Sequence, residues 1–344
     1  MFSFNREELK DSLYKIAKPK VLVVGDLAID EMIYGNTERI SREAPVLILR
    51  HYNTKIILGG ASNAAHNISA LNGGKVSVVG LYGDDYYGPV LLEALKQANI
   101  NTDYMVMDES RVTTVKTRVS GSCSQSVTQQ IVRIDRETTE FVSTEIENKL
   151  IANIEKAIPE HDCVILSDYN IGIMTQRVIN ETIRLAKKYG KIVTVDAQKD
   201  LDRYKGATAM TPNQPDTEKF VGYFIKDENT LYKAGKDMLN KTDCDMVLIT
   251  RGGDGMAVFE KNGKVSEIPV FNKTDVFDVT GAGDTVVASF TLALAAGLKP
   301  AMAAIIGNLA ASIVIRRFGC ATTNIDELVT AVNKLNFNNI TAKI

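Results

Sequence analysis

Short apolar segments rich in β-branched residues alternate along this chain with segments of helical periodicity, and this alternation limits the possible folds more than any other feature. The apolar segments lack a polar face, as strands buried inside a parallel sheet do. Strands are expected at 21–27, 76–82, 163–169, 192–197 and 246–252. Helices are expected between them at 61–72, 86–98, 144–157, 175–189 and 228–240. These repeated strand–helix units predict an α/β fold with a doubly wound, mostly parallel central sheet and helices on both faces.

Residues 32–58 and 112–135 interrupt this pattern. Each segment contains two short stretches of alternating polarity around a polar turn, with no helix between them, which is typical of a β-hairpin. Together they predict a small antiparallel sheet outside the main one, placed as a lid. The chain has no linker-like or low-complexity segment, so lid and core are expected to form one domain over 1–344. Because a small open sheet exposes its edges, we expect a homodimer through the lid.

The charge balance excludes several classes of partner. The 344 residues include 40 Lys and Arg and 42 Asp and Glu, a net charge of −2. Such a chain has no general attraction for nucleic acid or an anionic membrane, so its partner is expected to be a small molecule. It shows no signal peptide and no apolar segment that could span a bilayer, which predicts a cytoplasmic protein. Its four cysteines and three histidines lack metal-ligand spacing, so we expect reduced thiols and no zinc site.

The segment VTGAGD, residues 279–284, opens an apolar helical segment. Its glycines allow the backbone N–H groups of Gly281, Ala282 and Gly283 to point at one spot, where the positive end of the helix adds to the field. Such a nest suits an anion, above all the charge on a transferring phosphoryl group. Asp284 stands beside it and can accept a hydroxyl proton, so the segment predicts phosphorylation of an alcohol. The alternative is that Asp284 only caps the helix.

A second polar group is expected near the end of the first strand. LGGASN places Gly59, Gly60 and Asn63 at a helix start, and GDLAID places Asp26 and Asp30 after a buried strand. Open α/β sheets bind ligands at the carboxyl ends of their strands. These carboxylates and the amide are therefore expected to pair with sugar hydroxyls, the alternative being that they form a turn and a cap.

The two signatures GGASNAAHN and DVTGAGD, about 220 residues apart, together resemble those of the ribokinase-like (PfkB) carbohydrate kinases over residues 18–333. The resemblance implies a three-layer sandwich, with a mostly parallel sheet between helices and a small β lid that closes over a sugar. It implies ATP as phosphoryl donor. It also implies that Asp284 is the catalytic base and that the amides of Gly281, Ala282 and Gly283 form the anion hole.

Further segments resemble the nucleotide side of that family. TPNQPD resembles the Asn-x-x-Glu motif near magnesium and the phosphates, with Asn213 matching and Asp216 in place of Glu. Because Asp is shorter, its contact with Mg²⁺ is expected to run through water. TRGGDG resembles the nucleotide loop, and a monovalent cation is a further candidate ligand. The residues expected near ATP are Asn213, Thr250, Gly252, Gly255 and Asn308.

Within the family, TERISREAPV, SDY at 167–169 and DRYKGATAMTPN most resemble the bacterial heptose-7-phosphate kinases that supply lipopolysaccharide and related surface glycans. That resemblance implies a heptose 7-phosphate phosphorylated at its anomeric hydroxyl. A sugar phosphate requires cationic partners. The candidate sugar and phosphate contacts are Arg39, Arg42, Lys116, Arg118, Arg133 and Asp168.

Two departures keep other acceptors open. Where those kinases tend to read SDYAKG and DPKG, this chain reads SDYNIG and DAQK, so one lysine is replaced by Ile171 and another is displaced to Lys199. A hexose phosphate, ribose, fructose or a nucleoside are the alternative acceptors. The chain contains no His-x-Gly-His motif, so a following nucleotidyl transfer is expected from a separate protein.

Three other functions are disfavoured. No G-x-G-x-x-G motif follows the first strand, which argues against a dehydrogenase. The sequence also lacks the G-x-x-x-x-G-K-[ST] motif, which argues against a P-loop enzyme. A non-catalytic sugar or nucleotide sensor has no need of the base at Asp284.

Overall fold

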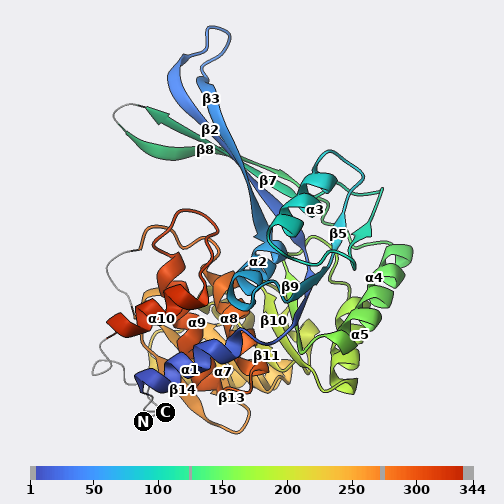
Figure 1. Cartoon of the computed structure of the whole chain (residues 1–344), viewed down its shortest axis with the longest axis vertical. Coiled ribbons are helices and arrows are strands. Elements are labelled where there is room, and N and C mark those ends of the chain that lie inside the picture. Colours follow the sequence, from blue (N-terminus) through green and yellow to red (C-terminus); the bar gives the residue numbers. More distant parts are fainter. Residues whose placement is uncertain (1–4, 124–125, 272–275, 336–344) are drawn as a thin grey trace.

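A computed structural model describes residues 5–123, 126–271 and 276–335. Its centre is an eight-stranded sheet in the order β14-β13-β12-β11-β10-β9-β1-β4, in which only β13, near one edge, runs antiparallel to the other strands. The strands are β1 (Val21–Gly25), β4 (Val76–Val79), β9 (Cys163–Asp168), β10 (Ile192–Ala197), β11 (Ala209–Met210), β12 (Met246–Thr250), β13 (Met256–Glu260) and β14 (Val265–Ile268). The predicted doubly wound sheet is confirmed (Figure 1).

Helices cover both faces of this sheet, because successive residues of its strands point to opposite sides. Val21 and Val23 of β1 join one buried cluster, and Leu22 and Val24 join the other. The first cluster includes residues of α1 (Arg6–Ile16), α2 (Ala61–Asn72), α3 (Tyr87–Gln97), α8 (Ala282–Ala295), α9 (Pro300–Val314) and α10 (Ile325–Lys334). The second includes residues of, or is packed against by, α4 (Thr144–Ala157), α5 (Gln176–Lys188), α6 (Gln214–Val221) and α7 (Glu228–Thr242). The result is a three-layer sandwich.

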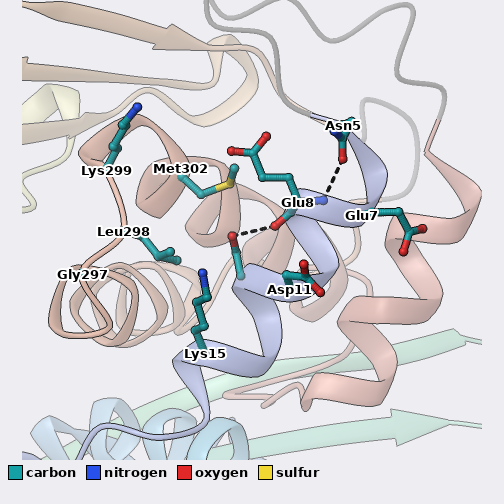
Figure 2. Close-up of a pocket in the computed structure, with 10 residues that line it drawn as sticks. Asn5, Glu7, Glu8, Asp11, Lys15, Gly297, Leu298, Lys299 and Met302 are labelled. Atoms are coloured by element: carbon teal, nitrogen blue, oxygen red, sulfur yellow. Dashed lines mark hydrogen bonds between the residues drawn. The ribbon is translucent and has the colours of Figure 1, made fainter.

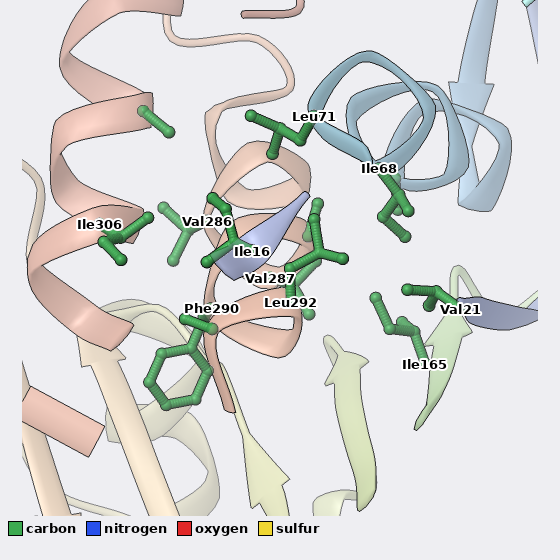
Figure 3. Close-up of a cluster of buried hydrophobic side chains, with 14 of the residues drawn as sticks. Ile16, Val21, Ile68, Leu71, Ile165, Val286, Val287, Phe290, Leu292 and Ile306 are labelled. Atoms are coloured by element: carbon green, nitrogen blue, oxygen red, sulfur yellow. The ribbon is translucent and has the colours of Figure 1, made fainter. Parts of the chain in front are cut away.

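The apolar helix that follows the TGAGD motif lies at the centre of the first cluster. Val286, Val287 and Phe290 of α8 pack with Ile68 of α2 and Ile165 of β9 (Figure 3). α8 is buried along most of its length, which explains its uniformly apolar sequence. This packing fixes the N-terminal end of α8 against the N-terminal end of α2.

The lid is a separate four-stranded sheet that projects from the core (Figure 1). It contains β2 (Leu27–Ile40), β3 (Leu47–Gly60), β7 (Val115–Cys123) and β8 (Ser126–Arg136), in the order β3-β2-β7-β8. Two antiparallel hairpins are present, as predicted, but β2 and β7 join them in parallel. The antiparallel pairing expected within each hairpin is therefore confirmed, whereas the junction between the hairpins is parallel. The strands, of 14, 14, 9 and 11 residues, are longer than expected. Between β3 and β7 the chain passes through the core, so β7 can enter beside β2 in the same direction.

Smaller elements complete the fold. The expected strand at 76–82 divides at Gly80 into β4 and β5 (Leu81–Tyr82), and β5 pairs with β6 (Val106–Met107) in a two-stranded sheet. Single 3₁₀ turns occur at η1 (Ile158–Glu160), η2 (Leu201–Tyr204) and η3 (Gly252–Asp254). No helix in the described ranges combines the length and apolar character needed to cross a bilayer.

Candidate active site

Asp284 lies in the first turn of α8 and is held by side chains from two other elements. Asn63 of α2 donates from Nδ2 to Oδ2 of Asp284 at 2.6 Å. The hydroxyl of Tyr169, which follows β9, donates to Oδ1 at 2.9 Å. The two motifs singled out in the sequence, LGGASN and TGAGD, therefore meet at one buried carboxylate.

A polar network fastens these two helix ends together. Thr285 Oγ1 donates to Asn67 Oδ1 at 2.7 Å, and Asn67 Nδ2 donates to the Asn63 carbonyl at 2.9 Å. All three side chains are buried, and paired polar groups in such a setting fix a single arrangement. The side chain of Asn63 is thus oriented before any ligand arrives.

The pKa of Asp284 is raised from 3.8 to about 6. Burial is the largest cause, and the charge of Asp30 acts in the same direction, whereas the hydrogen bonds from Asn63 and Tyr169 lower the pKa. The carboxyl group is then ionised at neutral pH, with a proton affinity near that pH. A general base is most effective under those conditions.

The glycines before Asp284 have different surroundings. Gly281 caps α8 with a φ of 76°, and a Cβ there would lie 2.6 Å from Asn63 Nδ2, so only glycine fits. A Cβ on Gly283 would meet no atom within 4 Å, so this side of the turn is open. The Ala282 N–H donates to the Val279 carbonyl at 3.1 Å. One of the three predicted anion-hole amides therefore has a partner within the turn.

The lid meets the TGAGD loop at a pocket of about 170 Å³, here called the lid pocket. Arg118 of β7 and Asp30 of β2 line it, with Nη1 and Oδ1 2.5 Å apart. Neither of these two buried atoms is in hydrogen-bond geometry, so the pair is an ion contact with unused bonding capacity. The remaining lining residues are Met32, Ile57, Ser120, Thr128, Gln130, Asp278, Thr280, Phe318, Gly319 and Cys320.

The register of the lid places its charges on one face. Asp30 is opposite Lys116, Lys116 is opposite Asp135, and Arg118 is opposite Arg133, so these side chains share the face that carries Asp30 and Arg118. Arg133 differs from Arg118 because its guanidinium is bound by Asp135, with contacts of 2.7 and 2.8 Å. Two cations directly opposite one another repel, and an anionic ligand would relieve that repulsion.

Arg39 and Arg42 lie far from this pocket. Both are exposed, at the end of β2 and in the turn before β3. Nine residues of extended strand separate Arg39 from Asp30, roughly 30 Å at 3.3 Å per residue. Within one chain, the structure does not bring these two arginines to Asp284.

Asp26 and Asp168 are buried and already have partners in the protein. Asp26 accepts backbone N–H groups from Tyr169 at 2.8 Å, Ile171 at 3.2 Å and Ile173 at 3.4 Å. Asp168 accepts the Asn170 N–H at 2.7 Å. Its other oxygen, Oδ2, accepts a hydrogen bond from the Tyr204 hydroxyl and lies 3.7 Å from Arg203 Nη1. The pKa of Asp26 is raised to about 7, by burial and by the charge of Asp168. In this structure the two carboxyls organise the loop after β9.

The glycine pair at the end of β3 lets the lid strand approach these acids. A Cβ on Gly59 would lie 3.0 Å from Asp30 Cγ, and one on Gly60 would lie 2.6 Å from the Asp26 carbonyl. The expectation that Asp30 follows the first strand of the core is corrected. β2 begins at Leu27, so Asp30 belongs to the lid.

Four of the five predicted nucleotide residues lie at or just after the carboxyl ends of β11 and β12: Asn213, Thr250, Gly252 and Gly255. Asn213 caps α6 and forms a parallel bridge with Thr250, and the Thr250 N–H donates to the Pro212 carbonyl at 3.0 Å. Gly252 and Gly255 have positive φ of 53° and 84°, as a tight loop requires. Asn308 of α9 is buried and donates to the Pro269 carbonyl at 2.6 Å.

Asp196, at the end of β10, connects this region to Asp284 electrostatically. Its pKa is raised to about 8, first by burial and then by the charges of Asp284 and Asp216. The pKa of Asp216 is also raised, mainly by burial. Strand ends β9 to β12 thus carry Tyr169, Asp196, Asn213 and Thr250 in order along one edge, where open α/β sheets bind ligands.

A larger groove lies elsewhere. Its volume is about 480 Å³, and it runs between α1 and the turn before α9 (Figure 2). Glu7, Glu8 and Asp11 line one side and Lys299 the other, with no residue of the two motifs. This groove is larger than the lid pocket, but it contains none of the residues that the motifs bring together.

Three residues of the site were not predicted. Tyr169 directly follows β9 and Asp196 lies at the end of β10, and the rule that ligands bind at strand ends could have indicated both. Cys320 Sγ lies 3.7 Å from Asp30 Oδ2, and burial, followed by the charges of Asp30 and Asp284, raises the pKa of this thiol far above its usual range. It is therefore a neutral thiol that no local pattern announced.

Comparison with known proteins decides the family. The model described as pfkB family carbohydrate kinase matches residues 18–327. The chain belongs to the pfkB family of carbohydrate kinases. It is accordingly an ATP-dependent carbohydrate kinase, as the paired motifs predicted.

Relatives in this family include two proteins named Bifunctional protein HldE. The one from Aliarcobacter butzleri is 37% identical over 328 residues, which are 95% of this chain and 67% of that protein. The one from Desulfatibacillum aliphaticivorans is 40% identical over 310 residues, 90% of this chain and 62% of that protein. The pfkB-family chain thus spans about two thirds of the length of these relatives.

The fold also matches a solved pfkB-type kinase structure. Ribokinase from Arabidopsis thaliana, complexed with ribose and ATP, aligns with a TM-score of 0.70 at 18% identity, covering 93% of this chain and 100% of that one. This likeness confirms the ribokinase-like fold.

Proposed function

We propose that this chain transfers the γ-phosphoryl group of ATP to the anomeric hydroxyl of a heptose 7-phosphate, D-glycero-β-D-manno-heptose 7-phosphate. The observation that carries the proposal is the charged lid face, where Lys116, Arg118 and Arg133 gather with Asp30 above the loop that leads to Asp284. A carbohydrate kinase acting on an unphosphorylated sugar does not need this cationic face. The family relatives named Bifunctional protein HldE support the same substrate class.

In the proposed reaction, Asp284 accepts the proton of the acceptor hydroxyl as the sugar oxygen attacks the γ-phosphorus. The new O–P bond forms while the bond between the γ-phosphorus and the bridging oxygen of ADP breaks, and ADP leaves with that electron pair. The amides of Gly281, Ala282 and Gly283 are proposed to stabilise the charge on the transferring group, with Gly281 and Gly283 as the principal donors because the Ala282 N–H has an internal partner.

Magnesium fits the acids at the strand ends. The mutual repulsion of Asp196, Asp216 and Asp284, visible in the raised pKa of Asp196, would be relieved by a cation among them. The described residues contain no cluster of three or more His, Cys, Asp or Glu side chains that could hold a metal ion. We propose that Mg²⁺ would arrive with the phosphates of ATP and would contact Asp216 through water. When bound, the ion neutralises phosphate charge.

The remaining assignments follow from position. We propose that Asn213, Thr250, Gly252 and Gly255 approach the phosphates of ATP and that Asn308 lies near the adenine, with a monovalent cation as a further candidate ligand. Gly59, Gly60, Asn63 and Asp30 are proposed to surround the sugar, while Asp26 and Asp168 act by holding the loop that bears Tyr169.

We also propose a homodimer through the lid. Its strands expose Leu47, Ile56, Ile131, Val132 and Ile134, each at least 38% accessible, on a sheet with two open edges. The proposed interface comprises residues 32–58 and 112–135, of which 124–125 lie outside the described residues. Residues 1–344 are proposed to form a single kinase domain, in which these two lid segments are insertions. Light scattering at micromolar concentration tests the dimer, and a stable monomer would contradict it.

A kinase of a different phosphorylated sugar is the second candidate. Ile171, where the heptose kinases tend to carry lysine, is buried, and its carbonyl accepts Arg111 Nη1 at 3.0 Å. Position 171 therefore carries no cationic side chain where the heptose kinases tend to carry lysine.

The deciding experiment measures ADP release with ATP and a panel of acceptors. Heptose 7-phosphate, hexose phosphates, ribose, fructose and a nucleoside are compared by kcat/KM. The proposal expects the highest kcat/KM for heptose 7-phosphate. A higher value for a hexose phosphate selects the second candidate, and a higher value for any unphosphorylated acceptor overturns the role given to the lid cations.

A further inference from the structure

Tyr169 is the one hydroxyl-bearing side chain, among the described residues, with a hydrogen bond to Asp284. It follows β9 directly, at the edge where Asp196 and Asn213 also lie. Its hydroxyl donates to Asp284 Oδ1 while Asn63 donates to Oδ2, so each carboxylate oxygen has one fixed donor. Asp284 can accept the proton of an acceptor hydroxyl at the oxygen lone pairs that remain free.

The backbone around Tyr169 is held unusually firmly. Its own N–H and those of Ile171 and Ile173 converge on the Asp26 carboxyl group. Asn170 adopts a positive φ of 60°, a conformation that non-glycine residues keep only where their surroundings impose it. The ring of Tyr169 also faces the lid, with Lys116 Nζ 5.8 Å from its centroid. The phenol therefore has little freedom to leave Asp284.

We infer that Tyr169 is a positioning residue for the phosphoryl transfer: its hydroxyl, clamped by the Asp26 loop, orients the Asp284 carboxylate and keeps it ionised. The inference rests on the proposed role of Asp284 as the base. It goes beyond that role because it makes the loop after β9 part of the catalytic apparatus.

The electrostatics around Asp284 agree with this geometry. Burial and the charge of Asp30 of the lid disfavour the ionisation of Asp284, and Asp284 in turn raises the pKa of Asp196 and of the Cys320 thiol. Only the donors Asn63 and Tyr169 oppose them. Tyr169 remains a donor at every working pH, because burial and the charge of Asp284 raise its pKa well above 10.0.

The test is the pH dependence of kcat/KM for the sugar in Tyr169→Phe, which removes the hydroxyl and keeps the ring. Loss of a donor to the carboxylate raises its pKa, so the acidic limb of the profile is expected to move to higher pH by roughly one unit. The Kd for ATP should stay unchanged. Tyr104→Phe is the matched control, since the Tyr104 hydroxyl donates to Glu160 at 3.1 Å, with no link to Asp284.

A double-mutant cycle completes the test. If Tyr169 acts through Asp284, Tyr169→Phe causes no further loss of turnover in an Asp284→Asn background. The inference is overturned if folded Tyr169→Phe keeps the wild-type limb, or if its effect on turnover is the same with and without Asp284. An Asp284→Asn variant with wild-type turnover would instead overturn the base assignment, so the two failures are distinguishable.

Discussion

Replacement of Asp284 by asparagine separates the chemistry of this carboxylate from its structural role. The amide has nearly the same shape, and its oxygen can still accept from Asn63 Nδ2 at 2.6 Å. Its nitrogen would then face the Tyr169 hydroxyl, which can rotate to accept. The glycine turn before it is unchanged. The variant is therefore expected to fold with the site assembled but without a group that can take a proton.

The expected loss of turnover is 10²–10⁴-fold, the usual contribution of a general base, which corresponds to roughly 3–5 kcal/mol of activation free energy. The free energy of unfolding, in contrast, is expected to stay the same or to rise. Because burial raises the pKa of Asp284 from 3.8 to about 6, keeping it ionised at neutral pH costs on the order of 3 kcal/mol. Loss of two charge-assisted hydrogen bonds offsets part of this gain. Asp284→Asn should thus be at least as stable as the wild type at pH 7.

The assay combines three measurements on the same preparation. The steady-state kcat is measured with the best acceptor of the panel, the affinities for ATP and sugar are measured by calorimetry, and the free energy of unfolding is measured in denaturant. We expect a low kcat, nearly unchanged affinities and equal or greater stability. A folded variant with wild-type kcat would show that Asp284 only caps α8, and a variant that loses several kcal/mol of stability would refute the account of its burial.

Three further predictions concern neighbouring groups. Arg118→Ala should lower kcat/KM for a phosphorylated sugar roughly 10- to 150-fold, the equivalent of a charge-assisted hydrogen bond, and Arg133→Ala should have less effect because Asp135 binds that guanidinium; equal losses toward an unphosphorylated analogue would contradict the assignment. Gly281→Ala should lower the free energy of unfolding by roughly 1–3 kcal/mol, since φ is 76° and the new Cβ would meet Asn63, and a wild-type melting temperature would argue against this geometry. The wild-type kcat/KM should fall as the pH drops through about 6, because the base must be ionised. Over the same interval the free energy of unfolding should gain a contribution from protonation of Asp284 in the folded state. A kcat/KM that stays constant down to pH 5 would contradict the raised pKa on which both expectations depend.

Features that depend on local backbone requirements could be predicted from the sequence. Buried parallel strands are apolar on both faces, so β1, β9, β10 and β12 were identified to within two residues. Gly281 adopts a positive φ beside Asn63, and the TGAGD motif indicates this requirement because it places a glycine at that position. The glycine turn and the helix that follows it were therefore identified correctly.

Features that depend on contacts between distant segments could not be predicted. The parallel pairing of β2 with β7 follows from where the chain returns from the core, which no local pattern records. The same holds for Tyr169, whose importance comes from an aspartate 115 residues away. The five candidate arginines and lysines carry the same charge in the sequence, and only the register shows that Arg118 faces the pocket while Arg39 lies near the hairpin tip.

The parallel junction in the lid has a consequence for how the chain folds as it is made. Glu31 of β2 and Thr117 of β7 are hydrogen-bonded at 2.7 Å although 86 residues separate them. At the usual synthesis rates of roughly 5–20 residues per second, one edge of β2 stays unpaired for on the order of ten seconds before β7 has been synthesised. An open strand edge of this length invites pairing with other chains. Pairings this distant in sequence also form slowly, so pulse-labelled hydrogen exchange during refolding should protect the amides that pair β2 with β3 before those that pair β2 with β7.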